Sequence, residues 1–346
     1  MHRLAITTTD GDEIGGLLDI YADHVVEIRQ DVQSRLQSSP AGDVLSPYFE
    51  RGKMVRARLV LAAADAVAGR PDLARAGAVA IELLHGASLV HDDIIDRSPR
   101  RRGLVAVHEV LGSDQALVLG DELLLQAFAA IVEGPGPAAR VLGATQVLAT
   151  TAHACCCGQL RELRAGRWVT EREYFSIVRG KTAAQFVAAV SVGAILGGAD
   201  DAELRRLREF AEALGIAFQI ADDLLDLLGD AETMGKPIAN SLALGRPLLP
   251  LIYLRHLDAG VAESLTTNVV ASDRPDRALA ELIDVLEHRG VLDNVRRVQK
   301  AHADAAFAAL SGFEHHADLL RALATGAVAS MRPASGQSAS ATRVGH

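Results

Sequence analysis

The chain has 346 residues, of which 49% are hydrophobic and 23% charged, so it can bury a sizeable core in one large domain or two. Its formal net charge of −9 argues against nucleic acid as a partner. No charged segment followed by an apolar stretch opens the sequence, so we expect no signal peptide.

Helical periodicity dominates the predicted elements, and two long helices stand out. Apolar residues recur at spacings of three and four over residues 77–95 and again over residues 204–228. The second helix has a predicted start at Asp200, with Glu203 three residues later as in a capping box, and a predicted end at Gly229. We therefore predict an all-α protein.

Few segments depart from the helical pattern. Leu4–Thr9 and Thr266–Val270 are weak candidates for strands, and the Ser-, Ala- and Gly-rich residues 333–346 predict a disordered tail. The helices are too apolar to stand apart, so residues 1–332 are expected to form one domain. Breaks between helices are predicted at Gly134–Pro137, Gly197–Gly198 and Gly235–Pro237.

Two further features bear on location. The longest apolar stretch, Phe186 to Ala199, is interrupted by Ser191 and by glycines. It is shorter than the ~18–20 residues that span a bilayer, so no transmembrane segment is expected. Three consecutive cysteines at 155–157 suit neither a disulfide framework nor zinc-ligand spacing. We interpret them as small, core-facing helix residues and expect a reducing, cytoplasmic location.

Two aspartate-rich motifs carry the strongest functional signal. They read HDDIID at residues 91–96 and ADDLLDLLGD at residues 221–230, and both lie in apolar sequence. Because a helix has 3.6 residues per turn, the first and last aspartates of each DDxxD share one helix face. Two such faces brought together would present hard oxygen ligands suited to Mg²⁺ carrying phosphate groups. The two pairs are Asp92 with Asp96 and Asp222 with Asp226.

Basic residues accompany these motifs and predict direct phosphate contacts. Arginine's planar fork suits phosphate oxygens, and lysine supplies point charge. A solvated basic loop is the simpler reading of RSPRRRG alone, but its place beside the aspartates favours an anion site. The basic residues are Arg97, Arg100, Arg101, Arg102, Lys53, Arg56, Lys181, Lys236 and Arg246.

These runs together resemble the trans-isoprenyl diphosphate synthases, in the family's order from about Gly52 to Pro250. The runs that carry the resemblance are IELLHGASLVHDDIIDRSPRRRGLVAVH (81–108), GDELLLQAF (120–128), KTAAQF (181–186), FQIADDLLDLLGD (218–230) and GKPIANSLALGRPLLP (235–250).

The resemblance implies an isoprenoid synthase fold, a single-domain bundle of long antiparallel helices around a central cavity, as a homodimer. It implies head-to-tail condensation of isopentenyl diphosphate with an allylic diphosphate. The implied cofactor is Mg²⁺, three ions per active site. Cationic charge would stabilise the departing diphosphate, and an apolar cavity would keep water from the carbocation.

Site residues follow from the resemblance, position by position. The implied principal magnesium ligands are Asp92, Asp96 and Asp222, with supporting or water-mediated contacts from Asp93, Asp223 and Asp226. The allylic diphosphate would be held by Arg101, Lys181 and Lys236, and Arg246 would also bind substrate. The isopentenyl diphosphate site would comprise Lys53, Arg56, His85 and Arg102. The polar residues lining the reacting centre would be Thr182 and Gln219.

The chain departs from the family pattern at several positions. Met54 replaces a basic residue, Val105 a proline, and Gln185 an apolar residue of KTAxLF. In the KPxGxDLxxGK segment, Ser241 replaces an aspartate and Arg246 replaces a lysine. Loss of the carboxylate at 241 is expected to weaken metal loading or alter the choice of allylic substrate.

Product length is predicted on steric grounds. Ala87 and Ser88 lie five and four residues before Asp92, about one helical turn from the metal-binding end. Both are small, so growth is not stopped near fifteen carbons and we expect twenty carbons or more. Deeper candidates for the floor of the tunnel are Leu84, Ile81 and Phe128.

Three alternatives remain open from the sequence. A class I terpene cyclase or an unusual prenyl-coupling enzyme would share the metal site but normally lacks the isopentenyl diphosphate residues. A non-catalytic partner subunit would be expected to lose one acidic motif. A helical scaffold would leave costly buried carboxylates unexplained.

Overall fold

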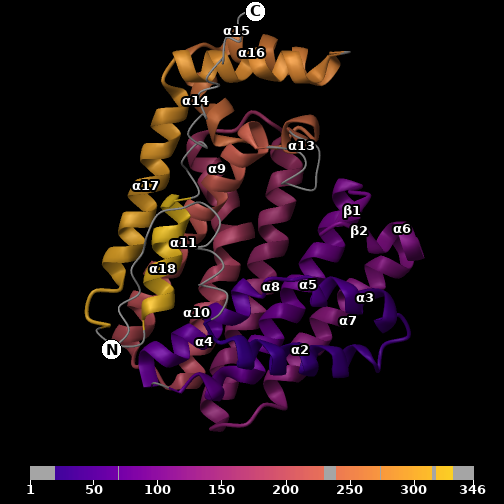
Figure 1. The fold of residues 1–346 in the computed structure, drawn as a ribbon, viewed down its shortest axis with the longest axis vertical. Coiled ribbons are helices and arrows are strands. Elements are labelled where there is room, and N and C mark those ends of the chain that lie inside the picture. Colours follow the sequence, from indigo (N-terminus) through magenta and orange to yellow (C-terminus); the bar gives the residue numbers. More distant parts are fainter. Residues whose placement is uncertain (1–19, 69, 230–238, 273, 314–316, 330–346) are drawn as a thin grey trace, which may run out of the picture.

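The computed structural model describes residues 20–68, 70–229, 239–272, 274–313 and 317–329, and nearly all of these are helical (Figure 1). The prediction of an all-α fold is confirmed. The first half contains α2 (Ala22–Leu36), α3 (Gly42–Glu50), α4 (Val55–Ala68), the 3₁₀ turn η1 (Pro71–Ala74), α5 (Arg75–Asp96), α6 (Val107–Leu111), α7 (Ser113–Val132) and α8 (Ala138–Ala165).

The second half of the chain is also built from helices. It contains α9 (Glu171–Val178), the π-helical turn η2 (Arg179–Ala183), α10 (Ala184–Gly197), α11 (Asp201–Leu228), α13 (Asn240–Ala243), α14 (Leu249–Leu257), α15 (Ala259–Ala271), α16 (Pro275–His288), α17 (Val291–Ala309) and α18 (Asp318–Ala329).

The predicted boundaries of α11 are confirmed in atomic detail. The Asp200 side chain accepts from the backbone N–H of Glu203 at 2.8 Å, and the Glu203 side chain accepts from the N–H of Asp200 at 2.9 Å. Such a capping box satisfies donors that the first helical turn leaves free. The helix ends at Leu228, before Gly229. The predicted break at 134–137 lies between α7 and α8, and the one predicted at 197–198 begins at Gly198, because Gly197 is the last residue of α10.

Two apolar cores are joined along α11. The first lies between α2, α4, α5, α7 and α10 and takes in Leu207–Leu214 of α11. The second lies between α9, α14, α15, α16 and α17 and takes in Ile216–Leu227 of α11. The second acidic motif is therefore held at the inner core of the half that carries α14–α17.

Two close helix crossings depend on glycine. A Cβ at Gly193 of α10 would come within 2.0 Å of the carbonyl oxygen of Val60 on α4. A Cβ at Gly158 of α8 would come within 2.8 Å of the backbone nitrogen of Lys181 in η2. Only a residue without a side chain permits such backbone approach. The second crossing places α8 directly against the lysine of the KTAAQF run.

Three expectations about local structure were wrong. The Thr266–Val270 candidate strand lies inside α15, where Thr266 and Val269 are buried three residues apart and Val270 is exposed, as helical spacing requires. An unexpected two-residue hairpin, β1 (Arg100–Arg101) and β2 (Leu104–Val105), follows α5. The cysteines are helical but do not all face the core, since Cys156 is exposed and its two neighbours are only partly buried.

Three helical segments are long and apolar enough to cross a membrane by length and composition alone: Pro71–Asp96, Ser113–Val132 and Glu171–Gly197. The expectation drawn from the uninterrupted stretch that begins at Phe186 did not include them. Within the protein, 61% and 67% of the first and third apolar windows are buried, against 39% for α7. Packing in the protein core therefore accounts for much of the apolar character of the first and third segments.

Four sequence predictions fall outside the described residues. They are the Leu4–Thr9 strand, the break at 235–237, Lys236 and the tail at 333–346.

Candidate active site

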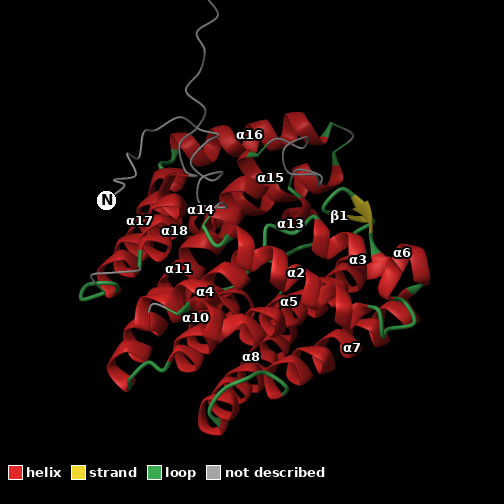
Figure 2. Cartoon of the chain, turned by 60° about the horizontal axis from the view of Figure 1, so that its bottom comes forward, coloured by secondary structure: helices red, strands yellow, loops and turns green. Residues whose placement is uncertain are grey.

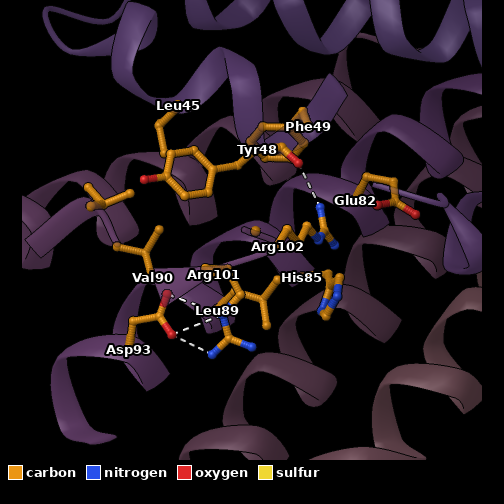
Figure 3. Close-up of a pocket in the computed structure, with 12 residues that line it drawn as sticks. Leu45, Tyr48, Phe49, Glu82, His85, Leu89, Val90, Asp93, Arg101 and Arg102 are labelled. Atoms are coloured by element: carbon orange, nitrogen blue, oxygen red, sulfur yellow. Dashed lines mark hydrogen bonds and ion pairs between the residues drawn. The ribbon is translucent and has the colours of Figure 1, made fainter. Parts of the chain in front are cut away.

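The first acidic motif forms the last two turns of α5. Asp93 is almost fully buried, and its carboxylate accepts from Arg101 Nε at 2.9 Å (Figure 3). The turn residues Arg102 and Gly103 both have positive φ, 52° and 75°, as a two-residue hairpin of type I′ requires. This turn brings Arg101 back onto the helix that precedes it, so a local sequence feature builds the ion pair.

The second acidic motif lies at the end of α11. Asp223 accepts from Tyr174 Oη at 2.7 Å, from Gln219 Nε2 at 3.0 Å and from the backbone N–H of Leu249 at 3.0 Å. Burial raises the pKa of the Asp223 carboxyl to about 7 against the opposing effect of these hydrogen bonds. Asp226 accepts from the backbone N–H of Ser241 at 3.1 Å. Tyr174 was not identified from the sequence.

The π-helical turn η2 connects the two motifs. Lys181 Nζ lies 3.8 Å from Asp92 Oδ1 of the first motif. Its neighbour Thr182 donates to Gln219 Oε1 at 2.6 Å, and Gln219 in turn donates to Asp223 of the second motif. Two adjacent residues thus face opposite acidic helix ends. Single π-helical turns often occur at functional sites, because the extra residue redirects side chains.

Glu162 of α8 contacts the lysine of η2 and was not identified from the sequence. We call Lys181, Thr182 and Arg246, which lie between the two acidic motifs, the cationic bridge. Its carboxylate lies 2.6 Å from Lys181 Nζ and 4.0 Å from Arg246 Nε. Arg246 also forms an ion pair with Asp96. The only signal for Glu162 in the sequence is a carboxylate one turn after Gly158, where α8 crosses η2. Glu162 therefore holds Lys181 and Arg246 in line with the first motif.

The donor set at the two helix ends fits magnesium. No group of three or more Asp, Glu, His or Cys side chains within the described ranges is already arranged around a metal position. Asp92 and Asp96 are instead paired with cations, which a divalent ion would displace or share. Together with the half-buried Asp222 they offer the hard, charged oxygens that Mg²⁺ prefers. Asp93 and Asp223 already receive several hydrogen bonds each.

A second anion site lies beside the first motif, about two turns earlier along α5 at His85. Arg56 Nη1 lies 3.1 Å from His85 Nε2, and the Arg56 guanidinium stacks 5.2 Å from the centre of the Phe186 ring. Burial lowers the pKa of Arg56 to about 10, and burial together with Arg56 and Arg102 lowers the pKa of His85 well below its usual value. Lys53 lies three residues before Arg56 and is exposed.

Arg102 reaches this site from the hairpin. Its Nη1 donates to the carbonyl oxygen of Tyr48 at 2.7 Å, and a Cβ at Gly52 would come within 2.6 Å of the same nitrogen. Figure 3 shows Arg102 between Tyr48 and His85. The structure therefore brings together three of the four predicted residues, whereas Lys53 is exposed and no contact joins its side chain to them.

Glu82 of α5 lies next to the second anion site and contacts the helix that carries Arg56. It was not identified from the sequence. It is 4% exposed, and its Oε1 accepts from the backbone N–H of Ala57 at 2.9 Å, in the first turn of α4. Burial raises its pKa, while nearby Arg56 and Arg102 act in the opposite direction. The carboxylate orients the helix that carries Arg56. A glutamate inside a buried helical stretch was the available signal.

The predicted chain-length residues lie on the inner side of the bundle. Ile81, Leu84 and Ala87 are 1%, 6% and 4% exposed, and Phe128 packs against the same core. Ser88 donates to the carbonyl oxygen of His85 at 2.8 Å. The steric assignment of these residues stays a prediction.

An all-α bundle in which two aspartate-bearing helix ends flank a cationic bridge is the architecture of an isoprenoid synthase. The polyprenyl synthetase family model matches residues 41–286, and the chain belongs to that family. It is a trans-polyprenyl diphosphate synthase, an enzyme that transfers prenyl groups.

Known proteins of similar sequence and structure agree with this assignment. A short chain isoprenyl diphosphate synthase of Methanothermobacter thermautotrophicus is 35% identical, over 74% of this chain and 78% of its own length. A geranylfarnesyl diphosphate synthase of Natronomonas pharaonis is 32% identical, over 71% and 76%. A solved geranylgeranyl pyrophosphate synthetase of Pyrococcus horikoshii superposes with a TM-score of 0.82 at 30% identity, over 93% of this chain and 100% of that one.

Proposed function

We propose that this enzyme condenses isopentenyl diphosphate head-to-tail with an allylic diphosphate, in a Mg²⁺-dependent reaction, to products of twenty carbons or more. The observation that carries the proposal is the bridge of Lys181 and Thr182 between the two acidic helix ends, with the Arg56–His85 pair beside it. Together these features form two sites for diphosphate. One has carboxylates that can hold a metal ion, and the other binds the anion through basic side chains alone.

Each part of the site has a distinct task in this reaction. Asp92, Asp96 and Asp222 would hold magnesium, which when bound would supply positive charge at the leaving diphosphate. Lys181 and Arg246 add cationic charge there, which favours breaking the allylic C–O bond. The double bond of isopentenyl diphosphate, held at the Arg56–His85 site, then attacks the carbocation. The released diphosphate is the base proposed to remove the proton.

The retained cationic site argues against the alternatives. A cyclase has no use for a second diphosphate site, yet Arg56, His85 and Arg102 lie together beside α5. A partner subunit without activity has no use for two complete acidic motifs. Both motifs are present and are oriented by hydrogen bonds.

We also propose that two copies associate through α7 and α8, which lie side by side (Figure 2). Large apolar side chains are exposed on α7, including Val118 at 66% and Leu125 at 69%. On α8 one set of exposed residues recurs at spacings of four and three, as in a helix that packs on another helix. They are Leu142, Gln146, Ala149, His153, Cys156, Leu160 and Leu163. A cytoplasmic location suits the free cysteine side chains.

One assay tests the reaction. Purified protein is incubated with Mg²⁺, labelled isopentenyl diphosphate and an allylic diphosphate of ten, fifteen or twenty carbons, and the products are sized. Label should move into chains of at least twenty carbons with at least one primer. Removing the metal with EDTA should abolish transfer, and adding Mg²⁺ should restore it. Label that stays in the starting material with every primer would contradict the proposal.

A further inference from the structure

Gln185 stands where sequences of this pattern carry an apolar residue, and the structure gives its amide a defined environment. It lies in the first turn of α10, next to η2, and is only 8% exposed. Its two polar atoms face α5: Oε1 lies 3.1 Å from His85 Nδ1, and Nε2 lies 3.3 Å from Ser88 Oγ. A buried amide is costly unless both of its ends are paired, and here both ends are paired with residues of α5.

The hydrogen bonds around Gln185 determine where each proton lies. The Ser88 hydroxyl donates to the carbonyl oxygen of His85 at 2.8 Å, so Oγ is left to accept. Only the NH₂ group of Gln185 can donate to it, which turns Oε1 towards His85. An amide oxygen only accepts, so His85 Nδ1 carries the proton. His85 Nε2 is then the acceptor that meets the guanidinium of Arg56.

We infer that Gln185 is a positioning residue for the isopentenyl diphosphate site, because it fixes the ring orientation and tautomer of His85 against Arg56. The inference rests on the proposed function, which places isopentenyl diphosphate at Arg56 and His85. An apolar residue at 185 would leave Nδ1 buried without an acceptor. The ring could then rotate or exchange tautomers, and the Nε2 contact with Arg56 would no longer be held.

A different role is conceivable from position alone. Ser88 belongs to the residues expected to line the path of the growing chain, so position alone would allow Gln185 to set product length. The geometry favours the positioning role, since both ends of the amide are engaged by α5 and neither is directed at a hydrocarbon chain. The two roles predict different kinetic changes.

The main test compares Gln185→Leu with Gln185→Glu, which keeps an acceptor oxygen for the Nδ1 proton. Gln185→Leu should raise KM for isopentenyl diphosphate about tenfold, the effect of one lost buried hydrogen bond. KM for the allylic diphosphate, kcat and product length should stay within about twofold. Gln185→Glu should recover most of the loss. Ser191→Ala, which removes another buried polar group of α10, is the matched control.

Several outcomes would overturn the inference. They are an unchanged KM for isopentenyl diphosphate in Gln185→Leu, an equal rise for both substrates, or a change confined to product length. If the wild-type enzyme itself fails to incorporate isopentenyl diphosphate, the proposed function fails instead, so the two failures are distinguishable.

A measurement on the wild-type protein keeps the inference testable if Gln185→Leu does not fold. Long-range ¹H–¹⁵N NMR spectra report which histidine nitrogen is protonated, and the signals of His85 are assigned by their loss in His85→Gln. We expect the Nδ1–H tautomer. Observation of Nε2–H in the wild-type enzyme would refute the role assigned to Gln185.

Discussion

At the residue scale, the site depends on charged and polar groups whose protonation is set by burial. His85 illustrates this, because burial is the main cause of its lowered pKa and the guanidinium groups of Arg56 and Arg102 add to it. The histidine is therefore neutral in the folded enzyme at neutral pH, which agrees with its role as an acceptor from Arg56.

This has a consequence for stability. Below an ordinary histidine pKa of ~6.5 the unfolded chain binds a proton at His85 that the folded protein does not. The free energy of unfolding should therefore fall as pH decreases from about 7 to 5, by up to ~1.4 kcal/mol per pH unit from this residue. His85→Gln should weaken that dependence in urea denaturation curves. His256→Gln, at an exposed position, serves as the control and should leave the curves unchanged.

At the scale of single elements, α5 carries both the metal-binding end and the expected path of the growing chain. Ala87→Phe adds a bulky ring about one turn from the first acidic motif, where the side chain is 4% exposed. The product should shorten by at least one five-carbon unit, measured by chromatography of the dephosphorylated alcohols. Ala305→Phe, at an exposed position on α17, should not change the product. An unchanged length in Ala87→Phe would refute the tunnel assignment.

The crossing of α4 and α10 brings two helix backbones into close approach. Gly193→Ala places a Cβ within 2.0 Å of the Val60 carbonyl oxygen, so α10 must shift. We expect a loss of about 1–3 kcal/mol in unfolding free energy, despite the better helix propensity of alanine. Gly260→Ala meets an atom only at 3.7 Å and should be neutral or stabilising. Equal stability of the two variants would show that the helices adapt freely.

At the scale of the whole molecule, α7 and α8 present an apolar surface that a single copy leaves uncovered. Charged substitutions at its centre, Leu125→Arg with Leu160→Arg, should convert a dimer into a monomer in analytical ultracentrifugation. Leu257→Arg, at the exposed end of α14, is the matched control and should leave the mass unchanged. A wild-type protein that sediments as a monomer at micromolar concentration would contradict the proposed association.

Much of this enzyme was predictable from local patterns. Helical periodicity, the capping box at Asp200 and Glu203, and the two acidic motifs each depend on residues within one or two turns of one another. Such features follow from backbone geometry and side-chain chemistry alone. The family could be inferred because the order of the motifs is itself a feature of the sequence.

What the sequence by itself determined was the set of helices and the residue types that bind diphosphate. Only the tertiary structure decided which of them meet. Glu162 with Lys181 and Arg246, Glu82 with Ala57, and Gln185 with His85 each join segments at least nineteen residues apart. Their pairing depends on where helices cross, as at Gly158 and η2, and on burial, which a chain acquires only when it packs.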